Sequence, residues 1–242
     1  MSRTFVFGDI HGAFTALTEL IDIIGVEKDD TLIFLGDYVD GWSQSYEVVQ
    51  YLMQLDETHR CIFIKGNHDV WCENWLTQGT VDELWYHSGG KATIESYSNR
   101  SDEALREHIN FYERMLNYHV DEENRLFVHA GFSAVRGPQH ERYASNFTWD
   151  RTLWETAISL DDRIPKDSPI YPKRLKLFKE IYIGHTPTLQ IGRYQPVNAA
   201  NVWNMDTGAA FDGKLSVMNV DTKEFWQSHQ VLELYPNEKG RN

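Results

Sequence analysis

The residues of this sequence that could do chemistry gather in five short clusters, each placed directly after a short apolar run. The clusters contain Asp, Asn or His close to glycine, and such side chains bind divalent cations or move protons. Glycine lets the backbone turn sharply there or come close to a ligand. A single histidine of this kind would be read as an ordinary core or surface residue, but five runs that end alike indicate a site. The clusters hold Asp9 and His11, Asp37 and Asp40, Asn67 and His68, His129, and His185.

The spacing of these residues predicts two adjacent metal sites. Asp9 and His11 are two positions apart, and on an extended segment such side chains point the same way, so both could bind one ion. Asp37, after the next apolar run, could bridge two ions. A set of oxygen and nitrogen ligands suits Mn, Fe or Zn better than Ca, and the lack of thiolates argues against a structural zinc site. Three further residues could complete the second site: Asn67, His129 and His185.

The first three clusters follow β-like runs that alternate with helical segments. The runs cover residues 4–7, 31–35 and 61–64, while residues 14–24 and 46–55 carry apolar side chains at helical spacing. This alternation predicts an α/β fold, in which helices flank a sheet. Ligands in such folds bind at the carboxyl ends of the strands, and the polar clusters lie at these ends.

The remainder of the chain predicts one helical region and further strands. Residues 70–116 should be mostly helical, with one helix that begins at Ser101 and turns Leu105, Ile109, Tyr112 and Leu116 to the core. No linker separates any part, so we expect a single domain over residues 1–242, with 70–116 as a helical insertion or cap-like segment. We expect a hairpin at 118–120 and 126–128, a loop at 133–146, a helix at 147–160, strands at 181–183, 202–205, 215–220 and 223–227, and a loose tail after Pro236.

Composition limits the partners of the protein. The chain has 242 residues, of which 41% are hydrophobic and 13% aromatic, as in folded globular proteins. Its 23 basic and 36 acidic residues give a net charge of −13, which argues against binding to nucleic acid or to an anionic membrane. An anionic substrate remains compatible with this charge, because bound cations reverse the field locally. Two cysteines, no signal peptide and no long apolar run predict a cytoplasmic protein.

The five clusters, read in order as GDIHG, GDYVDG, GNHD, HAG and GHT, resemble the motifs of the calcineurin-like metallophosphoesterases. The resemblance runs from Phe5 to about Gly208. It is closest to the phosphoprotein phosphatase branch, with its small bacterial and phage serine/threonine phosphatases and its symmetrical diadenosine tetraphosphatases. The resemblance implies a four-layer α/β/β/α sandwich with mixed central sheets and a site at the rim of the sheets.

The resemblance also implies a role for each motif residue. His68 would donate a proton to the leaving group, and Asp40 would orient His68. Two divalent ions would be bound per chain, with Mn²⁺ as the first choice and Fe, Zn, Ni or Co as alternatives. The first ion would be held by Asp9, His11 and Asp37, and the second by Asp37, Asn67, His129 and His185.

The sequence departs from the family pattern after Asp40. The second motif of the family usually ends in Asp-Arg-Gly, and its arginine binds substrate phosphate, whereas Gly41 follows Asp40 here. A second family arginine lies in a Trp-x-Arg element after HAG, and Arg151 fits its place as a substrate-binding residue. Two arginines of the preceding loop could supply the missing charge: Arg136 and Arg142.

The sequence therefore predicts a dinuclear metal-dependent phosphatase that hydrolyses phosphate monoesters by direct attack of a metal-bound hydroxide. The leading prediction for the substrate is a phosphoprotein, which would make the protein a serine/threonine phosphatase, and small phosphate esters or nucleotides remain open. One alternative with the same chemistry is a hydrolase of dinucleoside polyphosphates of the diadenosine tetraphosphate type. Another is a non-catalytic metal-binding module on the same scaffold, which the retained histidines disfavour. The net charge of −13 disfavours a nuclease.

Overall fold

The strands of the chain form two mixed sheets. The computed structural model describes residues 2–241. Within this range the strands are β1 Thr4–Phe7, β2 Thr31–Phe34, β3 Arg60–Phe63, β4 Tyr118–Val120, β5 Arg125–Val128, β6 Glu180–Ile183, β7 Val197–Ala199, β8 Val202–Asn204, β9 Ser216–Asn219 and β10 Phe225–Gln227. The first five-stranded sheet has the order β10-β9-β1-β2-β3, and the second has the order β4-β5-β6-β8-β7.

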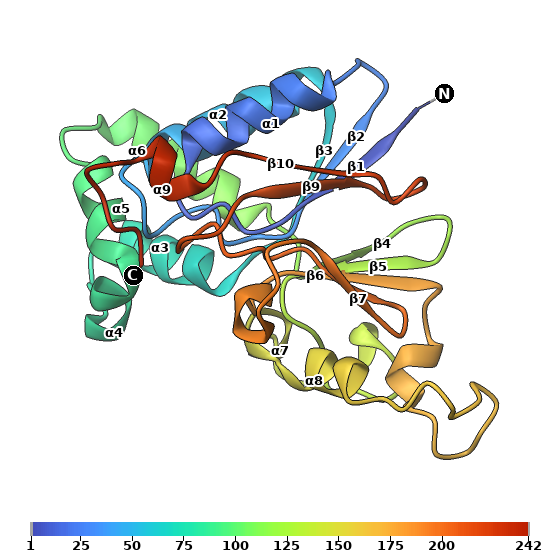
Figure 1. The fold of residues 1–242 in the computed structure, drawn as a ribbon. Helices are drawn as coiled ribbons and strands as arrows, with labels where there is room; N and C mark the ends of the chain where they lie inside the picture. The colour runs from blue at the N-terminus through green and yellow to red at the C-terminus, as the bar shows by residue number, and fades with distance from the viewer. Residues whose placement is uncertain (1, 242) are drawn as a thin grey trace.

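Helices cover the outer faces of both sheets and extend from one side of the molecule (Figure 1). A short π-helical turn at Tyr86–Gly90 joins α4 to α5, and 3₁₀ turns lie at Pro138–His140, Lys173–Lys176 and Thr188–Ile191. The α-helices are α1 Phe14–Ile24, α2 Ser45–Thr58, α3 Asn67–Gln78, α4 Glu83–Trp85, α5 Lys91–Ser96, α6 Asp102–Glu113, α7 Ser145–Trp149, α8 Thr152–Ile158 and α9 Val231–Leu234. No helix in the described range is both long and apolar enough to cross a membrane.

Three apolar clusters show that the sandwich has four layers, α/β/β/α, as predicted. One cluster lies between the first sheet and α1, α2 and α9, and another lies between the second sheet and α7 and α8. The third lies between the two sheets. Alternation along the strands supplies these clusters, because successive strand residues face opposite sides. In β1, Phe5 and Phe7 pack on the helices while Val6 packs on the other sheet, and Tyr182 of β6 faces Phe127 of β5 in the same inner layer.

Parallel strands at the centre of each sheet bring the polar loops to one edge. β1 pairs in parallel with β2, and β2 with β3. In the second sheet β5 pairs in parallel with β6, and β6 with β8. The loops that follow these strands therefore leave each sheet on the same side, where ligand sites of α/β folds form.

Most elements predicted from the sequence are present within a few residues of their predicted bounds, but three expectations are wrong and one strand is missing from the prediction. The helix predicted at 147–160 is broken, because Asp150 accepts hydrogen bonds from Thr152 N and Leu153 N and so begins α8 anew. The strand β7 has no counterpart among the predicted strands. The helix α6 begins at its predicted cap Ser101 and buries Tyr112 as expected. Of the other side chains expected in the core, Leu105 and Ile109 are only partly buried, and Leu116 lies outside the helix with 45% exposure. The buried side chains of α6 are His108, Phe111 and Tyr112.

The third wrong expectation is the loose tail after Pro236. Glu238 accepts hydrogen bonds from Ser43 N at 2.9 Å and Ser43 Oγ at 2.7 Å. Arg241 N donates to Ala210 O at 2.8 Å. The segment therefore folds back over the loop that follows β2, although its polar composition predicts little packing.

Candidate metal centre

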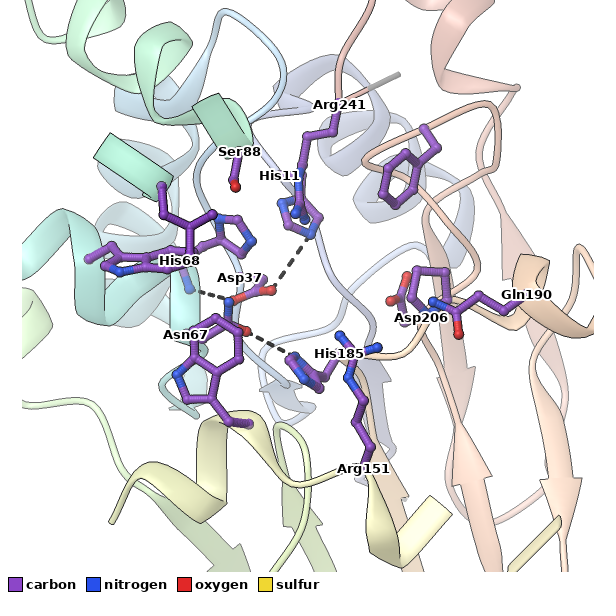
Figure 2. A pocket seen from close by; sticks show the side chains of 15 residues that line it. His11, Asp37, Asn67, His68, Ser88, Arg151, His185, Gln190, Asp206 and Arg241 are labelled. Atoms are coloured by element: carbon purple, nitrogen blue, oxygen red, sulfur yellow. Dashed lines mark hydrogen bonds and ion pairs between the residues drawn. The ribbon is translucent and has the colours of Figure 1, made fainter. Parts of the chain in front are cut away.

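The loops at the shared edge bring the residues of all five sequence clusters together. Figure 2 shows members of four of these clusters: His11, Asp37, Asn67 with His68, and His185. Each loop follows a strand directly, so the short distance from strand end to side chain fixes where the side chain lies. The loop after β1 carries Asp9 and His11, the loop after β2 carries Asp37 and Asp40, α3 begins with Asn67 and His68, His129 follows β5, and His185 follows β6.

Asp37 lies at the centre of the cluster and contacts residues of both sheets. Its Oδ2 atom is 3.6 Å from His11 Nε2 and 3.4 Å from His129 Nε2. Two groups of three potential metal ligands share Asp37, and the ligand atoms within each group lie within 4.8 Å of one another. The groups are His11, Asp37 and His68, and Asp37, His129 and His185.

Asp9 and Asn67 lie beside these two groups. Asp9 Oδ2 is 4.0 Å from His11 Nε2 and accepts a hydrogen bond of 2.9 Å from His185 N. Asn67 Oδ1 lies 2.9 Å from His185 Nδ1 and 3.2 Å from His129 Nε2. The residues expected at the first ion and at the second thus form one continuous cluster around Asp37.

Backbone carbonyls orient two of the histidines. His129 Nδ1 lies 2.8 Å from Leu35 O, and His11 Nδ1 lies 3.2 Å from Val39 O and 3.1 Å from Asp40 O. A carbonyl can only accept, so Nδ1 carries a hydrogen in both rings, and Nε2 is the atom that faces Asp37. In the neutral ring this Nε2 atom has a lone pair for a metal ion, and histidine ligands of metals are commonly held in this way.

The backbone of the cluster adopts a conformation that non-glycine residues rarely use. His11, Asp37, Asp40 and His185 have φ values of 54°, 53°, 75° and 67°. Such left-handed residues are costly and gather at functional sites, where the surrounding structure holds them. Close packing adds to this constraint at Gly184, where a Cβ atom would lie 2.0 Å from Asp9 Oδ1.

His68 and Asp40 form a buried pair that one residue of α4 and one residue of α5 support. His68 Nδ1 lies 2.6 Å from Asp40 Oδ2, which also accepts a hydrogen bond of 2.6 Å from Trp85 Nε1. Thr93 Oγ1 donates to Asp40 Oδ1 at 2.6 Å. Three donors thus hold the Asp40 carboxylate, and the hydrogen on His68 Nδ1 leaves Nε2 free to act on a ligand. The contributions of Trp85 and Thr93 had no signal in the sequence.

Asp69, the last residue of the third motif, ties two loops together. Its carboxylate accepts hydrogen bonds from the backbone N of Asp37 at 2.7 Å, Tyr38 at 3.0 Å and Gly66 at 2.8 Å. Burial and the neighbouring Asp37 raise the pKa of Asp69 to about 7. Asp69 has no role in the site predicted from the sequence, yet it holds the loop that carries the central carboxylate.

Buried carboxylates dominate the electrostatics of the cluster. Burial, with Asp206 nearby, raises the pKa of Asp9 well above its usual range. Burial also opposes ionisation of Asp37, but His129 and His68 hold the pKa of Asp37 well below its usual range. Burial lowers the pKa of His129 too, and Asp37 overcomes this and raises it to about 10. The ionised carboxylates are thus stabilised by positive charge beside them. A proton on His129 or a bound cation can supply this charge.

The cluster fits divalent cations on two further grounds. Asp9 Oδ1 and His185 Nε2 are buried and have no hydrogen-bond partner among the described residues. Buried polar atoms are nearly always partnered, so such orphans indicate a missing ligand. Oxygen and imidazole donors together suit Mn, Fe and Zn.

The cluster opens into a cavity of about 250 Å³. Arg151, predicted to bind substrate, lines it, whereas Arg136 and Arg142 do not. Two charged residues that have no place in the predicted site also line the cavity, Asp206 and Arg241. Asp206 had a readable signal, since it follows β8 and precedes Thr207-Gly208 in the manner of the other clusters. Its pKa is raised to about 6 by burial, with Asp37 contributing.

A four-layer sandwich with two ligand groups that share one carboxylate defines the class of the metallophosphoesterases. The chain belongs to the calcineurin-like phosphoesterase family, which it matches over residues 2–211. It is therefore a hydrolase of phosphoric esters, and membership of this family implies divalent metal ions at the ligand groups.

Two relatives of the chain are named as bis(5'-nucleosyl)-tetraphosphatases. The chain is 25% identical to the asymmetrical bis(5'-nucleosyl)-tetraphosphatase PrpE of Oceanobacillus iheyensis, over 91% of this chain and 89% of the relative. It is 24% identical to the symmetrical bis(5'-nucleosyl)-tetraphosphatase of Neisseria meningitidis, over 92% of this chain and 94% of the relative. The solved structure of a protein serine/threonine phosphatase from Saccharomyces cerevisiae shares the fold with a TM-score of 0.60, at 14% identity over 94% of this chain and 79% of that chain.

Proposed function

We propose that the protein hydrolyses dinucleoside polyphosphates with two divalent metal ions. The observation that carries this proposal is the pair of ligand groups around Asp37. The cavity beside them has arginine side chains as well as aromatic rings in its wall. The relatives from Oceanobacillus iheyensis and Neisseria meningitidis, both named as bis(5'-nucleosyl)-tetraphosphatases, support the choice of substrate. The proposal thus adopts the alternative that the sequence left open, in place of the phosphoprotein substrate.

The metal ligands in this proposal are the residues predicted from the motifs. When bound, two divalent ions polarise phosphoryl oxygens and activate water near neutral pH. Mn²⁺ is our first choice, since the donors combine carboxylate, amide oxygen and imidazole. The first ion is assigned to Asp9, His11 and Asp37, and the second to Asp37, Asn67, His129 and His185.

His68 is the proton donor to the leaving group in this proposal. Asp40 accepts from its Nδ1 atom, so the ring is fixed with Nε2 available on the side of the cavity. His68 is 2% exposed, so the proton passes to a bound group and not to bulk water.

The cavity wall supplies contacts for both parts of a nucleotide. Arg151 is exposed, and no carboxylate of the described residues lies within ion-pair distance of it, so its guanidinium is available for phosphate oxygens. Trp71 and Trp149 lie edge to face with ring centroids 5.1 Å apart, and Trp149 is 43% exposed. An exposed indole beside a phosphate site offers a stacking surface for a base. A phosphoserine side chain would make no use of this surface.

A substrate profile tests the proposal. The protein is loaded with Mn²⁺, its metal content is measured, and kcat/KM is determined for diadenosine tetraphosphate, a phosphoserine peptide and p-nitrophenyl phosphate. We expect the highest kcat/KM for diadenosine tetraphosphate, and chromatography of the products shows which anhydride bond breaks. A higher value for the peptide would restore the serine/threonine phosphatase prediction. Two bound ions with no turnover of any substrate would favour the non-catalytic module.

A further inference from the structure

The segment 235–241, which we call the C-terminal strap, places an arginine in the wall of the cavity. Figure 2 shows Arg241 entering the site beside His11, on the side opposite Arg151. The two arginines come from unrelated parts of the fold, Arg151 from the junction of α7 and α8 and Arg241 from the strap. Between them lie the ligand groups around Asp37.

Two glycines form a slot for the aliphatic part of Arg241. A Cβ atom added at Gly41 would lie 3.3 Å from Arg241 Cγ, and one added at Gly89 would lie 3.2 Å from the same atom. Both glycines have a positive φ, 113° and 111°, so side chains are disfavoured there on conformational grounds as well. The Arg241 stem thus occupies space next to position 41, where the resemblance would place a phosphate-binding arginine.

Several contacts hold the strap in place. Tyr235 stacks on Trp42 with ring centroids 5.2 Å apart, and its hydroxyl accepts a hydrogen bond of 3.0 Å from Thr15 N. Glu238 accepts from the backbone and side chain of Ser43. Arg241 N donates to Ala210 O at 2.8 Å. Because these contacts hold the backbone at both ends of the strap, only side-chain rotation can move the guanidinium of Arg241.

The guanidinium of Arg241 makes no ion pair within the described part of the protein. Over residues 2–241 no carboxylate lies within ion-pair distance of it, and its one described ring contact is with Phe211, at 5.5 Å from the ring centroid. Asp206 is close enough for the charge of Arg241 to act on its pKa, but it forms no ion pair with the guanidinium. A partly buried guanidinium that no carboxylate pairs with, directed at a site for cations, is available to bind an anion. An arginine fork matches the oxygens of a phosphate group.

We propose that Arg241 binds a phosphoryl group of the substrate and so replaces the arginine that is absent at Gly41. This inference rests on the proposed phosphoesterase site and adds a residue to it that no motif contains. The substrate phosphate chain would lie between Arg241 and Arg151, with the ligand groups of Asp37 on one side. Arg241 is a binding residue in this scheme and takes no part in proton transfer.

The test compares Arg241→Met, which keeps the stem but removes the charge, with Arg241→Lys and with Arg142→Met. Arg142 is an exposed arginine that does not line the cavity, so Arg142→Met is the matched control. Binding of inorganic tripolyphosphate to the Mn²⁺-loaded proteins is measured by calorimetry, and KM and kcat are measured with diadenosine tetraphosphate. We expect Arg241→Met to weaken tripolyphosphate binding and raise KM by about 10- to 100-fold, the loss of a charged hydrogen-bond donor. Arg241→Lys should bind tripolyphosphate more tightly than Arg241→Met, and Arg142→Met should keep the wild-type affinity and KM.

Metal content and unfolding temperature distinguish a lost phosphate contact from a loosened fold. Both should be unchanged in Arg241→Met, because the stem still fills its slot. A second variant, Glu238→Ala, should loosen the strap and weaken tripolyphosphate binding to a smaller extent. Wild-type tripolyphosphate affinity and KM in Arg241→Met would overturn the inference while leaving the proposed function intact. A wild-type protein that hydrolyses none of the tested phosphate compounds would instead overturn the proposed function, and the binding measurement would still decide whether Arg241 contacts phosphate.

Discussion

Replacing His68 with asparagine should separate substrates by the quality of their leaving groups. The change removes the Nε2 proton donor and leaves an amide that can still donate to Asp40, so the buried carboxylate keeps a partner. General acid catalysis contributes about 10²- to 10⁴-fold to rate. We expect a loss in this range on an alkyl phosphate, since an alkoxide leaves poorly without a proton. The loss should be much smaller on p-nitrophenyl phosphate and on diadenosine tetraphosphate, whose leaving groups are stable anions.

A second variant, Asp40→Asn, measures how much the hydrogen bond from His68 to Asp40 contributes to the rate. The contact of 2.6 Å between His68 Nδ1 and Asp40 Oδ2 is a hydrogen bond to a charged group, worth about 1.5–3 kcal/mol. Converted to rate, this is a loss of about 10- to 150-fold on the alkyl phosphate. The double variant should be no slower than His68→Asn alone, because Asp40 acts through His68.

The assay is kcat with excess Mn²⁺ on three substrates, with metal content measured for every variant. His87→Asn is the matched control, since His87 is exposed and does not line the cavity. An equal loss on alkyl and aryl phosphates, with two ions still bound, would refute the role of His68 as proton donor. Loss of metal in His68→Asn would instead make His68 a ligand, a role that its place in the first ligand group allows.

Three further outcomes are expected. Asp37→Asn should lower the metal content from two ions per chain to fewer than one, as measured by plasma mass spectrometry, and two bound ions would remove Asp37 as the bridge. Gly184→Ala should also lose metal, because the new Cβ would lie 2.0 Å from Asp9 Oδ1 and must displace that carboxylate. His108 is buried, and burial lowers its pKa to about 4, so the unfolded chain takes up a proton there more readily than the folded one. Its contribution to the free energy of unfolding is therefore complete above pH 6.5 and is lost as the pH falls toward 4, by up to about 3 kcal/mol. In His108→Asn, chemical denaturation at pH 7 and pH 4.5 should show a smaller difference than in the wild type, and an unchanged difference would contradict the assignment.

The sequence was most informative where chemistry and local structure coincide. Asp9, Asp37 and His185 each follow a short apolar strand within a few residues, so the pattern of strand and polar loop predicts their common edge. The four layers could be inferred because the motifs match a known family. Alternation in the strands then agrees with the layers, as the opposite faces of Phe5 and Val6 show.

The parts that escaped prediction depend on contacts between distant segments. Trp85 and Thr93 reach Asp40 only because the helices after α3 fold back over the loop after β2. Arg241 has no local motif, and its place depends on a slot formed by Gly41 and Gly89. The pattern of hydrophobic and polar residues near Arg241 gives no sign that this segment packs into such a slot. Asp206 differs, because its strand and glycine repeat the signal of the other clusters and could have been read.

The contacts of Trp85 and Thr93 with Asp40 link the choice of ligand to the rate of the proposed reaction. The helices between residues 83 and 96 border the cavity and are the natural place to alter which molecules enter it. The same helices hold Asp40, which contacts His68. Under the proposed role of His68, remodelling these helices for a new ligand would therefore also change the rate of the reaction. Replacing residues 83–96 with the matching segment of a relative should therefore preserve activity only when that segment has a tryptophan at position 85 and a hydroxyl side chain at position 93.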